Sequence, residues 1–247
     1  MIRRRVELMD YGTLGNERES ENMATEAFLH IPSGTRFGYH GGMPWKREAN
    51  CLVQVREDIH AGIGLHLLAA PNGTGKTTLL RTLAGLCPTL QGHVKVYGEI
   101  CYLADELRTD PEMTAGTFFR SWFKNEALAS TKELACALKL SLTTPIGRLS
   151  RGNRQKVLLI LAEVKAQQRK ATVLLMDEPL TGLDIETREQ LTQLWSKKAT
   201  PAMRLVIMHE FDCVREADSL LTIARGQLCH STERGSSWME TYRALQS

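Results

Sequence analysis

The stretch Gly64-Leu-His-Leu-Leu-Ala-Ala-Pro-Asn-Gly-Thr-Gly-Lys-Thr-Thr-Leu-Leu80 decides the fold class. Its first seven residues form a mostly apolar run of the length expected for a buried strand. Pro71–Gly75 then predict a loop. Helical spacing follows in the apolar residues Leu79, Leu80, Leu83 and Leu86. This order of strand, loop and helix predicts the opening unit of an α/β fold.

The glycine-rich loop has the features needed to bind phosphate groups. Gly73 and Gly75 allow a backbone path that points successive N–H groups inward, and the following helix directs its positive dipole end at an anion. Lys76 adds a full positive charge, and the hydroxyl of Thr77 can ligate Mg²⁺. Such loops usually begin with glycine, and this chain has Ala70 at that position. The replacement removes no group that donates a hydrogen bond to phosphate. The predicted nucleotide-binding residues are Asn72, Gly73, Thr74, Gly75, Lys76, Thr77 and Thr78.

Two adjacent carboxylates end a second apolar run, Val173-Leu-Leu-Met-Asp-Glu178. Asp177 is predicted to hold Mg²⁺, directly or through a water molecule. Glu178 is predicted to polarise the water that attacks the γ-phosphorus of a bound nucleotide. The alternative is a strand end with two solvated acids. Lys76 lies 101 residues upstream of Asp177, and the presence of that phosphate loop favours the functional interpretation.

A second anion site is predicted in Leu149-Ser-Arg-Gly-Asn-Arg-Gln-Lys-Val157. Ser150 is a natural N-cap for a helix that continues to about Ala166. Its hydroxyl and the N–H groups of Gly152 and Asn153 together form the site. Ser150 is 74 residues from Lys76, and the two sites need a partner chain if they are to meet at one phosphate.

These motifs together resemble the ATP-binding subunit of an ABC transporter, over roughly residues 27–230. Five motifs stand in the family's order: Walker A at Ala70–Thr78, the signature at Leu149–Gln155, Walker B at Val173–Glu178, the D-loop at Leu183-Asp184 and the switch histidine at His209. A structural histidine in the core is the alternative interpretation of His209.

The resemblance implies an ATPase that uses ATP and Mg²⁺ and works as a dimer, with a second, identical or different ATPase subunit. Each ATP would lie between Walker A of one chain and the signature residues of the other, Ser150, Arg151, Gly152 and Asn153. Asp184 would also contact the nucleotide, and His209 would contact its γ-phosphate. Arg151 replaces a family glycine, and its cation could aid binding or face solvent. Separate transmembrane permease subunits would hold the dimer at the cytoplasmic face of the cell membrane.

Two positions of the family pattern are altered or ambiguous here. Asp105 and Glu106 occupy the region where the coupling loop normally carries Gln, and an acid there can still approach Mg²⁺ and the attacking water. Both are therefore candidate catalytic residues. Tyr39 is the preferred aromatic for stacking on adenine, and Trp45 is the alternative. Either ring could instead belong to the core of the N-terminal sheet.

The direction of transport follows from resemblance. The form Ser-Arg-Gly-Asn-Arg-Gln is similar to signatures of exporters for drugs, peptides and polymers, so we expect export. Haem export for cytochrome c maturation is an alternative. A soluble ABC-type ATPase acting on nucleic acid, ribosomes or iron–sulfur assembly is a further one. This soluble ATPase is disfavoured by the single cassette, by the net charge of +3 and by six cysteines without the spacing of a metal clip. No nucleic-acid partner is expected.

Patterns along the 247 residues predict the remaining organisation. Residues 1–22 form a polar extension, 23–231 the ATPase domain, and 232–247 a C-terminal helix or tail. Short strands are predicted for an N-terminal antiparallel β-subdomain and a mostly parallel sheet, at Ala27–Ile31, Thr35–Tyr39, Leu52–Val55, His93–Val96, Ile100–Leu103, Thr172–Met176, Arg204–Met208, Leu220–Ile223 and Gln227–His230. Glu186–Lys197 predicts a helix. No run of 18 apolar residues predicts a membrane span.

Helical spacing through about residues 107–168 predicts an inserted α-helical subdomain in the P-loop core. A groove beside it, around 105–114, is expected to receive a helix of the permease. Phe118, Phe119 and Trp122 either line that groove or pack inside the subdomain, and packing is the preferred interpretation.

Overall fold

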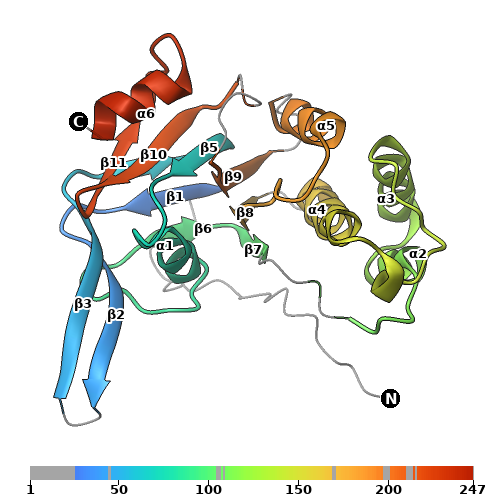
Figure 1. The fold of residues 1–247 in the computed structure, drawn as a ribbon, viewed down its shortest axis with the longest axis horizontal. Helices are drawn as coiled ribbons and strands as arrows, with labels where there is room; N and C mark the ends of the chain where they lie inside the picture. The colour runs from blue at the N-terminus through green and yellow to red at the C-terminus, as the bar shows by residue number, and fades with distance from the viewer. Residues whose placement is uncertain are drawn as a thin grey trace.

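The computed structural model describes residues 26–43, 46–103, 107, 109–168, 171–196, 201–209, 214 and 216–246. The predicted extension 1–22 lies outside these residues. The central feature is a sheet with the strand order β2-β3-β11-β10-β5-β9-β8-β7 (Figure 1). Its strands are β2 (Arg36–Met43), β3 (Lys46–Val55), β5 (Gly64–Ala69), β7 (Glu99–Leu103), β8 (Thr172–Asp177), β9 (Ala202–Ile207), β10 (Ser219–Ala224) and β11 (Gln227–Ser231).

The pairing within this sheet is mostly parallel, as predicted. The strands β10, β5, β9, β8 and β7 run parallel to their neighbours in an unbroken series. The pairs β2–β3 and β10–β11 are antiparallel. Because β5, β9 and β8 are adjacent and parallel, their carboxyl ends meet at one edge of the sheet, where α/β folds bind ligands.

A smaller antiparallel sheet has the order β4-β1-β6. Its strands are β1 (Phe28–Ile31), β4 (Ile59–Ala61) and β6 (Lys95–Tyr97). In the register of β1 and β4, His30 lies opposite His60. The predicted N-terminal antiparallel β-subdomain is therefore confirmed.

Helices cover the sheet, and residues 109–168 are mostly helical. The helices are α1 (Lys76–Leu83), α2 (Ala115–Trp122), α3 (Asn125–Ala137), α4 (Arg151–Gln168), α5 (Ile185–Ser196) and α6 (Trp238–Gln246), with a short 3-10 turn at Ile146–Arg148. Figure 1 shows α2 and α3 beyond α4, at the side away from β2 and β3. The helix α4 packs both on α3 and on β7 and β8.

Two apolar cores lie on opposite faces of the sheet, because successive strand residues point to opposite sides. Leu67 of β5 and Leu174 of β8 belong to the core that contains the apolar side chains of α4. Their chain neighbours Leu68 and Leu175 belong to the core that contains α1 and β1. The helices that follow the two predicted anion sites, α1 and α4, therefore pack on opposite faces.

Several element boundaries differ from those predicted. Strand β2 begins at Arg36 and continues past Tyr39 to Met43, and β3 begins at Lys46 instead of Leu52. These two strands form a long hairpin, and its paired residues are largely glycines and polar residues. Their sequence therefore lacks the alternation of apolar residues that predicts a strand. Strand β6 is Lys95–Tyr97, displaced from the predicted His93–Val96, because its register follows β1. The helix predicted at Glu186–Lys197 is described as Ile185–Ser196.

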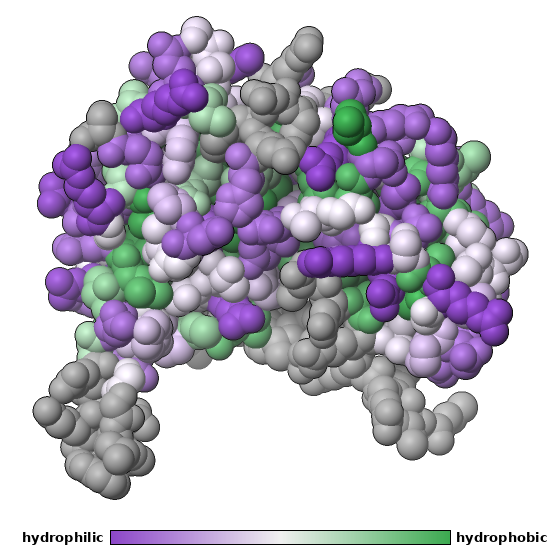
Figure 2. All heavy atoms as spheres, viewed as in Figure 1, coloured by the Kyte–Doolittle hydropathy of each residue, from purple (hydrophilic) through white to green (hydrophobic). Residues whose placement is uncertain are grey.

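The surface drawn in Figure 2 is largely hydrophilic, with smaller hydrophobic patches between the polar side chains. Within the described residues, no helix has both the length and the apolar character needed to cross a bilayer.

Candidate nucleotide site

The loop between β5 and α1 has the backbone geometry predicted for phosphate binding. Gly73 and Gly75 both have positive φ, 78° and 102°. The backbone angle of Gly75 favours glycine, and a Cβ there would also lie 3.0 Å from Cβ of Leu52, a close contact. Gly75 precedes the first turn of α1, whose first residue is Lys76. The first-turn N–H groups of α1 therefore face the loop.

Lys76 is buried and lies inside this loop. Its Nζ donates hydrogen bonds to the carbonyl oxygens of Ala70, at 2.8 Å, and Pro71, at 3.0 Å. Burial lowers the pKa of Lys76, and the carboxylates of Glu178 and Asp177 oppose that shift. The ammonium group is therefore already positioned in the loop by two oxygen acceptors, which phosphate oxygens can replace.

A hydroxyl and a carboxylate meet where α1 begins and β8 ends. Thr77 Oγ1 donates a 2.7 Å hydrogen bond to Oδ2 of Asp177. Oxygen ligands of these two kinds are the ones that Mg²⁺ prefers. The two residues predicted from separate motifs to bind the metal are thus brought together.

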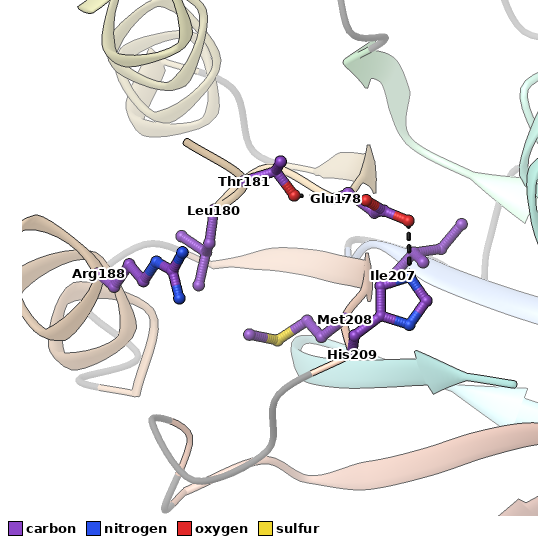
Figure 3. A pocket seen from close by; sticks show the side chains of 7 residues that line it. All are labelled: Glu178, Leu180, Thr181, Arg188, Ile207, Met208 and His209. Carbon is purple, nitrogen blue, oxygen red and sulfur yellow. Dashed lines mark hydrogen bonds and ion pairs between the residues drawn. The ribbon is translucent and has the colours of Figure 1, made fainter. Parts of the chain in front are cut away.

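Glu178 and His209 form the second contact at this edge of the sheet. His209 Nε2 lies 2.7 Å from Glu178 Oε1, and both side chains are partly exposed. Thr181 Oγ1 donates to the other carboxylate oxygen at 3.3 Å. Figure 3 shows Glu178 and His209 in one pocket, which Leu180, Thr181, Arg188, Ile207 and Met208 also line. The interpretation of His209 as a core histidine is wrong, because its side chain is exposed at the strand end.

The backbone at Glu178 is strained. Its φ is 48°, in the left-handed region that non-glycine residues rarely adopt. Such angles cost free energy and are retained where the surroundings fix the residue, often at functional sites. Here the hydrogen bonds from His209 and Thr181 hold the side chain.

The signature turn has its predicted cap, because the N–H of Asn153 donates to Oγ of Ser150 at 3.2 Å. Arg151 begins α4 and is exposed. A Cβ on Gly152 would lie only 2.5 Å from the carbonyl oxygen of Gly182. The sequence motif indicated only nucleotide binding for Gly152 and gave no signal for this packing against a loop 30 residues away.

Asp184 caps a helix within its own chain. Its carboxylate accepts hydrogen bonds from the N–H of Thr187, at 2.8 Å, and from the hydroxyl of Thr187, at 2.9 Å. These bonds lower the pKa of Asp184 to about 2. Lys156 of α4 lies 3.5 Å away and also donates to the carbonyl of Leu138. Contact of Asp184 with a nucleotide stays a prediction, and no local pattern indicated its pairing with Lys156.

The predicted adenine-stacking residue Tyr39 lies on β2 and is 53% exposed. Its hydroxyl accepts a hydrogen bond from Asn50 across the hairpin. The alternative Trp45 and the candidate catalytic residues Asp105 and Glu106 lie outside the described residues. Phe118 and Phe119 are buried, and Lys165 lies over the Trp122 ring, so their packing interpretation is confirmed.

A protein-family model described as ABC transporter matches residues 54–181, which contain the phosphate loop, the signature turn and the adjacent carboxylates. The chain belongs to the ABC transporter family. Among solved structures, one described as the ATP-binding subunit of an ABC transporter superimposes on it with a TM-score of 0.72. The superposition covers 89% of this chain and 100% of that structure. At 20% sequence identity, the likeness supports a shared fold.

Curated members of the family are similar to this chain. The aliphatic sulfonates import ATP-binding protein SsuB 1 of Pseudomonas fluorescens is 36% identical over 187 residues, which are 69% of this chain and 66% of that protein. The cytochrome c biogenesis ATP-binding export protein CcmA of Zymomonas mobilis is 30% identical over 131 residues, 52% of this chain and 58% of that protein. The match thus spans less than two thirds of the length of each of these relatives.

Proposed function

We propose that this chain binds and hydrolyses ATP to power a membrane ABC transporter. The observation that carries the proposal is the convergence of three motifs at the carboxyl ends of the adjacent parallel strands β5, β8 and β9. Lys76 follows β5, Asp177 and Glu178 end β8, and His209 follows β9. Residues separated by 100 positions in the sequence, Thr77 and Asp177, and by 31 positions, Glu178 and His209, are in direct contact at one sheet edge.

The phosphate loop binds the β- and γ-phosphates of ATP in this proposal. Lys76 exchanges the carbonyl oxygens of Ala70 and Pro71 for phosphate oxygens, and its charge offsets theirs. Gly73 leaves the approach open, since a Cβ there would meet no atom within 4 Å. The N-terminal dipole of α1 adds to the attraction.

Thr77 and Asp177 would hold Mg²⁺ through their hydroxyl and carboxylate oxygens, which already lie 2.7 Å apart. The metal ion supplies charge neutralisation of the phosphate oxygens when bound. Glu178 accepts the hydrogen bond of the attacking water and orients it. His209, through its 2.7 Å contact with Glu178, keeps that carboxylate at the pocket and contacts the γ-phosphate.

A dimer completes the site in this proposal. The loop before α1 and the turn before α4 belong to helices on opposite faces of the sheet. This arrangement favours binding of one nucleotide between Lys76 of one chain and Ser150, Gly152 and Asn153 of a second. Arg151 is exposed at the start of α4, where its charge would face that nucleotide.

The transporter context is proposed from the relatives. We propose separate permease subunits as partners, a position at the cytoplasmic face of the membrane, and export as the direction. The signature Ser150-Arg-Gly-Asn-Arg-Gln155 supports export, and the similar proteins carry both import and export names. Export for cytochrome c biogenesis is a second candidate, favoured by the 30% identity to CcmA.

The test compares Glu178→Gln with Glu189→Gln, a matched change on the exposed face of α5. Loss of a group that positions the attacking water predicts a fall in ATP hydrolysis of about 10²-fold or more. ATP affinity should stay within about twofold, because the phosphate loop is intact. Full hydrolysis by Glu178→Gln would overturn the assignment of this carboxylate.

The transport part is tested separately. Tagged chain is purified from gently solubilised membranes, and its partners are identified by mass spectrometry. A stoichiometric multi-span permease supports the proposal. Ribosomes, nucleic acid or a soluble assembly partner in place of a membrane protein would overturn the transport role while leaving ATP hydrolysis untouched.

A further inference from the structure

Two histidines face each other in the small antiparallel sheet. His30 of β1 and His60 of β4 are direct cross-strand partners. Their rings stack with centroids 4.1 Å apart and an interplanar angle of 8°. The side chains therefore project on the same face of the sheet, in the arrangement expected for opposing residues of an antiparallel pair.

A carboxylate completes the cluster. Asp58 precedes β4, and its Oδ2 lies 3.4 Å from Nε2 of His30. Its other oxygen, Oδ1, accepts a 2.8 Å hydrogen bond from the N–H of Ser33. That bond fixes the carboxylate from behind, which is the role of outer partners in metal sites. One donor atom from each of the three residues lies within 4.8 Å of the other two.

We propose that His30, Asp58 and His60 bind a divalent transition-metal ion of the Zn²⁺ type. Zinc binds imidazole nitrogen and carboxylate oxygen at about 2.0–2.2 Å, which places neighbouring ligand atoms in a tetrahedron about 3.3–3.6 Å apart. The 3.4 Å separation of Asp58 and His30 already has this value. A metal ion lies in the plane of each imidazole that it binds, so binding requires the stacked rings of His30 and His60 to rotate out of their parallel arrangement and point at the ion.

The donor chemistry selects the ion. Two imidazoles and a single carboxylate suit zinc, copper, nickel or iron, whereas Mg²⁺ and Ca²⁺ prefer sites made of oxygen. Three protein ligands leave a fourth position for water. Asp58 and His60 are exposed, so water and the ion reach the cluster directly. Binding would join β1, β4 and the turn before β4, and involves none of the nucleotide-binding residues.

The test is a calorimetric titration of the chelator-treated full chain with ZnCl₂. His60→Ala and Asp58→Asn are compared with His93→Ala, which removes an exposed histidine outside the cluster. The parent protein and His93→Ala should bind one more Zn²⁺ than the two cluster variants, or bind it at least tenfold more tightly. Any Zn²⁺ that binds at Glu178 and His209 would bind to the parent and to all three variants, so it does not affect the difference between them.

A second readout separates loss of ligand from loss of fold. Saturating Zn²⁺ should raise the Tm of the parent and of His93→Ala more than that of Asp58→Asn, since an ion that binds only the folded state stabilises it. Far-UV circular dichroism of the metal-free variants should match the parent. Equal stoichiometry and affinity in all four proteins would overturn the site and leave an ordinary hydrogen-bonded cluster. If His93→Ala lost as much Zn²⁺ binding as the two cluster variants, the binding would be non-specific and the proposed site would be overturned.

Discussion

Replacement of Gly152 by alanine tests whether the signature turn depends on packing within its own chain. The added Cβ would lie 2.5 Å from the carbonyl oxygen of Gly182, about 0.9 Å inside the 3.4 Å at which ordinary contact begins. That oxygen belongs to the backbone of the loop between Glu178 and α5, so a side-chain rotation cannot relieve the contact. The two loops must separate, and the surrounding core must accommodate the change.

The size of the effect follows from two opposing terms. Overpacking of this kind costs about 1–3 kcal/mol. Alanine in place of glycine within a helix contributes about 0.5–1 kcal/mol of stability. We therefore expect Gly152→Ala to lower the free energy of unfolding by about 1–2 kcal/mol, since the contact is with backbone. For a chain of this size the corresponding fall in Tm is about 2–8 °C.

The assay is thermal unfolding of the nucleotide-free chain, followed by circular dichroism. Gly62→Ala is the matched control, because a Cβ added at Gly62 would meet no atom within 4 Å. Its Tm should change by no more than the small shift of an ordinary surface substitution. An unchanged Tm in Gly152→Ala would refute the packing argument and leave nucleotide contact as the reason for glycine at this position.

Three further outcomes are expected. Arg204→Met leaves Glu163 buried without the cation that lies 2.7 Å from its carboxylate. The free energy of unfolding, measured in urea, should fall by about 3–5 kcal/mol. Adding Glu163→Leu should restore most of that loss. Asp184→Ala removes the cap of α5 and should cost about 0.5–2 kcal/mol at pH 7. Because the pKa of Asp184 lies at about 2, below its ordinary 3.8, this contribution is present above pH 4 and is lost as the pH falls toward 2, so acid unfolding of the two proteins should converge there. Asp177→Asn should abolish Mg²⁺-dependent hydrolysis while leaving the fold intact, and hydrolysis at the parent rate would contradict its role at the metal.

The phosphate loop and the paired carboxylates could be predicted because the residues that give each of them its chemistry are contiguous in the sequence. A strand, two glycines and Lys76 indicate the loop without reference to the rest of the chain. Parallel strands then place Asp177 beside Thr77, a contact that follows once the α/β order is recognised. His209 is identified at a strand end by its resemblance to the switch histidine, and its 2.7 Å contact with Glu178 is found only in the structure.

Other features depend on register and packing between distant segments, which local pattern does not encode. The contact of Gly152 with Gly182 arises where α4 crosses the loop after β8. The stacking of His30 on His60 requires the register of β1 and β4, and a shift of one residue would place the rings on opposite faces. The hairpin β2–β3 is longer than predicted because its glycines and polar residues lack strand periodicity.

The buried side chain of Glu163 fixes the C-terminal half of α4. Glu163 accepts hydrogen bonds from Arg204 of β9 and from the indole of Trp195 of α5, and both of these partners are buried. The helix rises about 1.5 Å per residue, so Glu163 lies about 18 Å from the start of the helix at Arg151. The first half of α4 is held separately, because Lys156 donates a buried 2.8 Å hydrogen bond to the carbonyl of Leu138. The turn that carries Ser150 and Arg151 is thus connected to β9 and α5 through one helix that is anchored in both of its halves.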